Sequence, residues 1–300
     1  MKVGIDSYSF HRYFGDVYEG LQEDPGVKWD MLEDFAPFAI AQRVDEVAVE
    51  SIFFPIFDDG YCEALAQRFE EAGISRVIGW GHPDGLHAGS DEEALEDLKR
   101  HIPRAPKLGV HIMRIVSGSM IHVDEPREPQ IRNSIWMLKE AVEVAADNDV
   151  VLAIENHIDF TGPEMLQIVE GVDSDHLRVN LDTGNPLRVY EDPVECARVL
   201  APYTVATHTK DITTGGKGGS PSTRFPFFPS CPTGQGLVDF EGVVGHLTEA
   251  GFAGSLAVEI DLVAPQFAHL PEEQIVADSV GFLRGLLARR SVPSTAGGAR

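Results

Sequence analysis

The sequence predicts a TIM-type (β/α)8 barrel, and three observations lead to that fold class. Short runs rich in valine and isoleucine alternate eight times with longer segments of helical period, which is typical of repeated βα units. Four of these runs end at an acid or a histidine, as expected where parallel strands converge on one catalytic mouth. An open doubly wound sheet usually carries a glycine-rich phosphate loop after its first strand, whereas here DSYSFHRYFG follows. The closed barrel is therefore favoured.

The elements follow one another as strand and helix along the whole chain. The expected strands lie at 3–5, 47–50, 76–80, 111–117, 150–154, 177–181, 204–207 and 255–258. The expected helices lie at 28–43, 59–73, 91–107, 129–147, 163–171, 192–201, 239–251 and 271–289. Two of the helix starts carry capping signals, Ser90 before DEEALEDLKR and Asp239 in DFEGVVGHL, because polar acceptors there satisfy free backbone amides.

One domain is expected over residues 1–290, because no linker or composition shift divides the chain. The 300 residues, 43% of them hydrophobic, suffice for a large core. An irregular stretch near 213–235 indicates an inserted loop after the seventh strand, and its phenylalanines 225, 227 and 228 suggest a lid, a subunit interface or a loop that buries its own aromatics. The polar residues 291–300 are expected to form a disordered tail.

The composition excludes several classes of partner. A formal net charge of −24 would repel phosphate backbones and anionic membranes, so no nucleic acid or membrane is expected and a neutral sugar or glycoside is the easier ligand. Cys62, Cys196 and Cys231 show neither metal-cluster nor disulfide spacing, so reduced thiols are expected. The sequence shows no signal-peptide pattern and no apolar run long enough for a membrane span, which predicts a cytoplasmic protein.

Four strand ends predict a metal site. Glu155, Asp182, His208 and Glu259 each follow an apolar run, and the first two intervals are 27 and 26 residues, close to one βα unit. Three carboxylates and one imidazole suit Mn²⁺ best, with Mg²⁺, Co²⁺ or Zn²⁺ also compatible. Any one of these residues could instead be an ordinary helix cap or surface residue. Capping does not explain four of them with a matched period, so the set predicts one divalent cation.

The segments around these residues resemble a known family. IENHIDFT (154–161), LDTGN (181–185), HTKD (208–211) and VEID (258–261) are similar to the metal-binding motifs of the xylose isomerase-like TIM barrel superfamily. That superfamily includes sugar isomerases, ketose 3-epimerases and the large subunits of C-glycoside deglycosidases. The resemblance implies that Glu155, Asp182, His208 and Glu259 bind one divalent cation, commonly Mn²⁺ or Mg²⁺.

Two departures from the family pattern bear on the reaction. Ketose 3-epimerases usually have a histidine three residues after the strand-six aspartate, where this chain has Asn185, and a glutamate at the position of Thr161. A typical epimerase site is therefore incomplete. Glu155 and Glu259 could still act as the paired acid and base of an aldose–ketose isomerase or ketose epimerase, which remains the alternative function.

His157 is a candidate catalytic base, together with Glu155 and Glu259. It lies two residues beyond Glu155, so it should point into the same mouth, and an imidazole can accept and return a proton near neutral pH. It could equally support the metal ligands. In C-glycoside deglycosidases, a similar Glu-Asn-His segment supplies a base that removes the C2 proton of a 3-oxo sugar. The resemblance thus favours a carbon–carbon lyase that releases the aglycone of 3-oxo-C-glycosides.

Further residues are placed at the predicted mouth. Substrate contacts are expected from His11, His82, Asn185 and Lys210, and Tyr8, Arg12 and Glu50 lie in the same predicted loops. A structural role is the alternative for each of them. The family resemblance adds a possible smaller β-rich partner subunit. A sugar-binding barrel without turnover is the non-enzyme alternative, and the intact set of four ligands argues against it.

Overall fold

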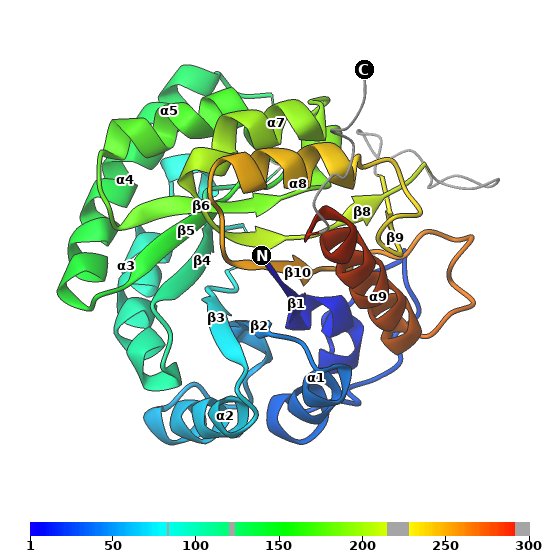
Figure 1. Ribbon diagram of the computed structural model, residues 1–300. Coiled ribbons are helices and arrows are strands. Elements are labelled where there is room, and N and C mark those ends of the chain that lie inside the picture. Colours follow the sequence, from blue (N-terminus) through cyan, green and yellow to red (C-terminus); the bar gives the residue numbers. More distant parts are fainter. Residues whose placement is uncertain (83, 120–123, 215–227, 292–300) are drawn as a thin grey trace, which may run out of the picture.

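Eight parallel strands surround the central axis of the molecule, confirming the predicted fold class (Figure 1). The computed structural model describes residues 1–82, 84–119, 124–214 and 228–291. The sheet has the order β10-β1-β2-β3-β4-β5-β6-β7, and a parallel bridge between Thr209 and Val258 brings its two edges together. The strands are β1 (Lys2–Asp6), β2 (Glu46–Glu50), β3 (Ser75–Gly79), β4 (Ile112–Val116), β5 (Val151–Glu155), β6 (Leu177–Asp182), β7 (Thr204–His208) and β10 (Ser255–Val258).

Helices form the outer layer around this barrel (Figure 1). The α-helices are α1 (Ala36–Gln42), α2 (Asp59–Glu71), α3 (Glu92–His101), α4 (Arg127–Asp147), α5 (Gly162–Val172), α6 (Asn185–Arg188), α7 (Pro193–Leu200), α8 (Phe240–Glu249) and α9 (Glu272–Ser291). The shorter helical turns are η1 (Ser7–Phe14), η2 (Met31–Phe35), η3 (Ser51–Phe53), η4 (His87–Gly89), η5 (Ile102–Leu108) and η7 (Ala201–Tyr203). Each of the eight predicted helical regions overlaps one of the α-helices, and the short helix α6 was not predicted.

Several predicted helix boundaries were wrong for identifiable reasons. The region predicted at 91–107 divides into α3 and the 3-10 helix η5, because Pro106 inside η5 has no amide hydrogen for a helical bond. Ser90 does not cap α3, since its hydroxyl donates to the His87 carbonyl, and Asp91 accepts from the Ala94 amide instead. The prediction for Asp239 is confirmed, because its Oδ1 accepts from the Gly242 amide at 3.1 Å.

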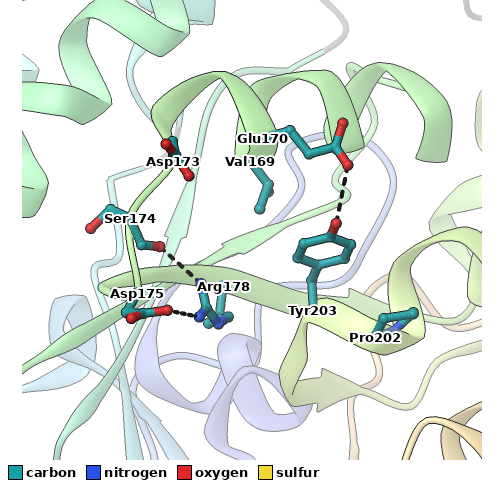
Figure 2. A pocket seen from close by; sticks show the side chains of 8 residues that line it. All are labelled: Val169, Glu170, Asp173, Ser174, Asp175, Arg178, Pro202 and Tyr203. Atoms are coloured by element: carbon teal, nitrogen blue, oxygen red, sulfur yellow. Dashed lines mark hydrogen bonds and ion pairs between the residues drawn. The ribbon is translucent and has the colours of Figure 1, made fainter.

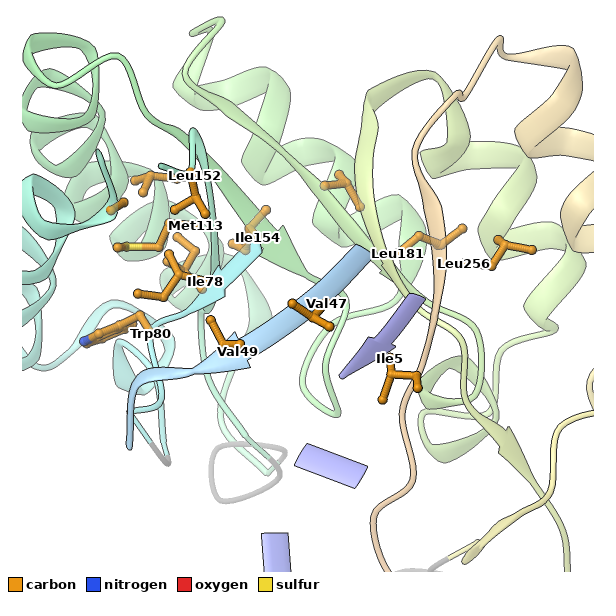
Figure 3. Packing of buried hydrophobic residues seen from close by; sticks show 14 of the residues in the cluster. Ile5, Val47, Val49, Ile78, Trp80, Met113, Leu152, Ile154, Leu181 and Leu256 are labelled. Carbon is orange, nitrogen blue, oxygen red and sulfur yellow. The ribbon is translucent and has the colours of Figure 1, made fainter. Parts of the chain in front are cut away.

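Successive side chains of each strand point to opposite faces of the sheet, so the buried residues form two layers. Val47, Val49, Leu152 and Ile154 belong to the large cluster that packs between strands and helices (Figure 3). Their neighbours on the opposite face of the strands form a second, small cluster of Ala48, Val77, Ala153 and Ala206. Continuing along the inner face, the polar residues Glu50, Glu155 and His208 follow two positions after these alanines. The inner face of the barrel therefore changes from small apolar side chains to charged ones at the carboxyl ends.

A short antiparallel pair of strands joins the start of the predicted inserted loop to its second half. β8 (Asp211–Ile212) pairs with β9 (Ser230–Cys231), while residues 215–227, including Phe225 and Phe227, lie outside the described residues. Helix α9 continues to Ser291, the first residue of the predicted tail, and 292–300 are likewise not described. The three cysteines are free, as predicted. Among the described residues, no helix combines the length and apolar composition that a membrane span requires.

Candidate metal centre

The four predicted ligands come together at the carboxyl end of the barrel. Glu155, Asp182 and His208 are the last residues of β5, β6 and β7, and Glu259 directly follows β10. All four are buried, and one ligand atom from each lies within 4.8 Å of the others. His208 Nδ1 is 2.9 Å from Glu259 Oε2 and 3.3 Å from Glu155 Oε2. Strands that are distant in sequence thus direct four potential ligands at one point.

The polar atoms at this point suit a divalent cation. Asp182 Oδ2, His208 Nδ1 and Glu259 Oε2 are buried and make no hydrogen bond of normal geometry in the described structure. Buried polar atoms without such partners are costly, so three of them around one point indicate a ligand site. Three carboxylates and an imidazole match the donors preferred by divalent metals from Mg²⁺ to Zn²⁺. The cluster could therefore hold one divalent cation.

Cationic side chains lie next to the carboxylates of the cluster. Lys210 Nζ lies 3.2 Å from Asp182 Oδ2 and 3.3 Å from Glu259 Oε2. Burial opposes ionisation of Glu155 and Glu259, but nearby cations outweigh it and hold the pKa of Glu155 well below its usual value and that of Glu259 at about 2. Burial raises the pKa of Asp182 to about 7, and for His208 the neighbouring carboxylates outweigh burial and raise its pKa. Cationic side chains of the protein therefore balance much of the negative charge of the cluster.

Neighbouring groups fix the orientation of the carboxylates. The LDTGN segment turns sharply after β6, so the backbone amides of Gly184 and Asn185 both donate to Asp182 Oδ1 at 2.7 Å. The side-chain amide of Asn185 donates to Glu155 Oε1 at 3.0 Å. From β4, Arg114 forms an ion pair with the other oxygen of Glu155. These contacts leave Asp182 Oδ2 directed at the ligand cluster, while Glu155 Oε2 is shared between Arg114 and His208 Nδ1.

Three functional neighbours were not predicted, although the sequence carries a signal for each. Asp6 Oδ2 lies 3.1 Å from His208 Nε2, and Asp6 ends β1 just as the predicted ligands end their strands. Arg114 interrupts the apolar run of β4, which is the pattern of a charged residue on an inner barrel face. Asp261, two residues after Glu259, forms an ion pair with Arg188 at 2.6 Å and lies 3.3 Å from Lys210.

A cavity of about 450 Å³ opens beside the cluster. Its lining includes the charged or polar residues Asp16, Glu50, His82, Arg114, Ser119, His157, Arg188, Lys210, Glu259 and Asp261. It also includes Gly81 and the apolar or aromatic residues Tyr8, Tyr18, Leu21, Ile52, Val116 and Ile158. Such a volume is in the range of small-molecule sites. The cavity therefore presents both a polar and an apolar surface to a ligand next to the candidate metal centre.

The predicted catalytic and substrate-binding residues divide into two groups. His157, His82 and Lys210 line the cavity. His157 Nδ1 lies 3.1 Å from the Gly118 carbonyl oxygen, and the His82 ring stacks on Trp80. Burial lowers the pKa of His157 to about 4.

His11 and Asn185 do not line this cavity. His11 is 2% exposed, lies 2.6 Å from the Asp16 carbonyl oxygen through Nδ1, and stacks behind the ring of Tyr8. Asn185 is fully buried and holds Glu155, as described above. Direct substrate contacts of these two residues stay a prediction, since neither belongs to the lining of this cavity.

A second pocket, of about 500 Å³, lies at the opposite, amino-terminal end of β6 (Figure 2). Its polar groups are engaged with one another: Arg178 donates to the Ser174 carbonyl and pairs with Asp175, and the Tyr203 hydroxyl donates to Glu170. In barrel enzymes this end serves stability rather than chemistry. The metal cluster and its adjoining cavity are therefore the candidate active site.

Fold and site together define a (β/α)8 barrel with a buried cluster of acids and a histidine at its carboxyl end that could hold a divalent cation. The family model for xylose isomerase-like TIM barrels matches residues 39–286, and the chain belongs to this family. It is 24% identical over 245 residues to 3-oxo-isoapionate decarboxylase of Pectobacterium atrosepticum, covering 81% of this chain and 79% of the relative. It is 27% identical over 184 residues to L-ribulose-5-phosphate 3-epimerase UlaE of Escherichia coli, covering 57% and 59%.

Solved structures share the whole architecture. An L-ribulose 3-epimerase superposes with a TM-score of 0.73 at 19% identity, covering 100% of this chain and 99% of the other. A xylose isomerase-like TIM barrel protein from Mycobacterium smegmatis in complex with magnesium gives 0.69 at 18% identity, covering 97% and 98%. At these identities the structures support the fold. The family nevertheless places the chain among sugar-processing enzymes, with epimerases and a decarboxylase as relatives.

Proposed function

We propose that this protein is a divalent-metal-dependent carbohydrate enzyme that forms an enolate from a sugar ketone and cleaves a carbon–carbon bond. Its preferred substrate would be a 3-oxo-C-glycoside, from which it releases the aglycone. The observation that carries the proposal is the position of His157, whose ring lines the cavity beside the metal cluster and is oriented by the Gly118 carbonyl. Mn²⁺ is the proposed native metal, and the magnesium-bound relative supports a divalent ion of this class.

The contact to Gly118 determines which nitrogen of His157 can act. A carbonyl oxygen only accepts hydrogen bonds, so Nδ1 carries a proton in this contact. Nε2 is then the nitrogen that can take a proton from a ligand. Because the ring lines the cavity, the geometry favours a base at this position.

The proposed reaction is an elimination. When bound by the four ligands, a divalent cation would polarise the 3-oxo group and so acidify the proton on C2. His157 would accept that proton at Nε2. The electrons of the C2–H bond would pass into the enolate, whose collapse would form the C1–C2 double bond while the C1–aglycone bond breaks with its electron pair. The leaving aglycone carbon takes up a proton, so atoms and charge balance, and Lys210 in the cavity wall is placed to stabilise negative charge.

The mixed lining of the cavity supports a glycoside over a free sugar. A sugar ring would use polar lining residues such as Lys210 and Glu259, while Leu21 and Ile52 offer apolar side chains. Both apolar side chains are partly open to solvent, with exposed fractions of 40% and 50%. A bound aromatic aglycone would cover this surface and gain from its burial. A free ketose would leave this apolar surface exposed to water.

The decarboxylase relative also favours carbon–carbon cleavage. By its name, 3-oxo-isoapionate decarboxylase removes a carboxyl group from a 3-oxo compound. Loss of CO₂ next to a ketone leaves an electron pair that the ketone takes up as an enolate. The proposed lyase needs the same stabilisation of an enolate, although it loses a proton rather than CO₂.

An epimerase or aldose–ketose isomerase is the second candidate, favoured by the relative L-ribulose-5-phosphate 3-epimerase. In that reaction Glu155 and Glu259 would exchange the proton. Glu259 lines the cavity, whereas Glu155 is held by Arg114 and Asn185. The β-rich partner subunit remains a prediction from the family resemblance.

The test is to incubate Mn²⁺-loaded protein in D₂O with a 3-oxo-C-glycoside and, separately, with free ketoses. Release of the aglycone supports the lyase, whereas deuterium incorporation with a new sugar isomer and no release supports the second candidate. His157→Gln should abolish release while Mn²⁺ binding persists. His111→Gln, which changes an exposed histidine, is the matched control and should keep wild-type activity. Full activity of His157→Gln would refute the assigned base.

A further inference from the structure

Asp6 is a buried carboxylate beside the metal cluster that the proposed reaction does not use. It ends β1 and is fully buried. Its two oxygens have different neighbours. Oδ1 accepts a hydrogen bond from the Tyr8 amide at 2.6 Å, which fixes the carboxylate as the cap of η1. Oδ2 lies 3.1 Å from Nε2 of His208.

The two nitrogens of the His208 ring have different neighbours. Nδ1 faces Glu155 and Glu259 in the cluster, while Nε2 faces Asp6 on the other side of the ring. A carboxylate can accept a hydrogen bond from Nε2–H, which keeps the proton on Nε2 and so favours the lone pair on Nδ1. In metal sites, a carboxylate partner of this kind fixes the tautomer of a ligating histidine and increases its basicity.

We infer that Asp6 is a positioning residue that holds the proton of His208 on Nε2 and thereby makes Nδ1 a metal ligand. The inference rests on the divalent-metal site of the proposed function and is independent of which sugar reaction the enzyme performs. Glu50 also lies near this contact, since ligand atoms of Asp6, Glu50 and His208 lie within 4.8 Å of one another. A second cation bound by these three residues is therefore the competing explanation.

Two substitutions separate positioning from a general structural role. In Asp6→Asn the amide oxygen should stay on the Tyr8 amide, so the NH₂ group replaces Oδ2 and faces His208 Nε2. An NH₂ group donates, which forces the His208 proton onto Nδ1, where the metal must bind. Asp6→Ala removes the partner without imposing the wrong tautomer. We therefore expect the isosteric variant to be the more damaging one, the reverse of what lost packing or capping would cause.

The measurement is calorimetric titration of the metal-free full chain with Mn²⁺. The wild type should bind one equivalent. Asp6→Asn should lower its affinity by about 10- to 100-fold, and Asp6→Ala by less. Equal affinity of Asp6→Asn and wild type would overturn the inference, as would a greater loss in Asp6→Ala. Two equivalents in the wild type, with one lost in Asp6→Asn, would assign Asp6 as a ligand instead.

A second measurement does not depend on the variants folding. In wild-type protein labelled with ¹⁵N-histidine and loaded with Zn²⁺, His208 should show a protonated, hydrogen-bonded Nε2 and a metal-bound Nδ1. The opposite assignment would overturn the inference. Failure of the proposed function is distinguishable, because an inactive protein with one metal and this tautomer would refute the reaction and leave the role of Asp6 intact.

Discussion

Replacing Arg114 with methionine should destabilise the metal-free protein strongly. The Arg114 side chain is 12% exposed and pairs with Glu155, and its other terminal nitrogen lies 3.8 Å from Glu50 Oε1. Removing one partner of a buried ion pair leaves an uncompensated charge and typically costs about 3–5 kcal/mol. Because His208 also neutralises Glu155, we expect the free energy of unfolding to fall by roughly 3 kcal/mol, near the lower end of that range.

The assay is urea unfolding followed by tryptophan fluorescence, in chelator and in excess Mn²⁺. Metal should recover part of the loss, since a cation held by Glu155 replaces the missing charge. Lys99→Met is the control: it removes a more exposed pair with Glu140 and should cost less than about 1 kcal/mol. Arg114→Met/Glu155→Gln should be more stable in chelator than Arg114→Met. A loss in Arg114→Met no greater than in Lys99→Met would refute the argument that the pair is a buried charge network.

Three further outcomes are expected. In thermal melting, Gly89→Ala should destabilise the protein more than Gly73→Ala does. Both glycines have a positive φ, which costs an alanine about 1–2 kcal/mol. Only at Gly89 would the new Cβ also lie 2.3 Å from the backbone of Asn133. Equal losses would contradict the steric reasoning. Burial raises the pKa of Asp159 to about 7, so the wild type should lose stability as pH rises from 4 to 7. Asp159→Asn should become more stable relative to the wild type over that interval. Parallel pH profiles of stability for the two proteins would contradict this role of Asp159. Asp182→Asn should abolish Mn²⁺ binding in calorimetry, and tight binding by this variant would remove Asp182 from the ligand set.

The sequence alone determined the fold class and the four candidate metal ligands. Both follow from local patterns: apolar runs alternate with helical segments, and Glu155, Asp182, His208 and Glu259 each stand at the end of such a run. In a parallel barrel, the carboxyl ends of all strands lie at the same end of the barrel. A residue that ends a strand in the sequence is therefore expected at that end of the structure. Helix ends were less certain, because Ser90 and Asp91 offer similar caps and only the chain path selects between them.

The tertiary structure decided which groups surround those ligands. Asp6 at the end of β1, Arg114 within β4 and Asp261 after β10 meet around the cluster, and no spacing in the sequence pairs Asp6 with His208, 202 residues away. It also showed which of the residues expected to contact the substrate line the cavity. His82 does, whereas His11 stacks on Tyr8 and is not part of the lining. Ion pairs and cavity walls depend on how side chains from distant strands pack, whereas the barrel follows from a periodic pattern that each βα unit carries in its own sequence.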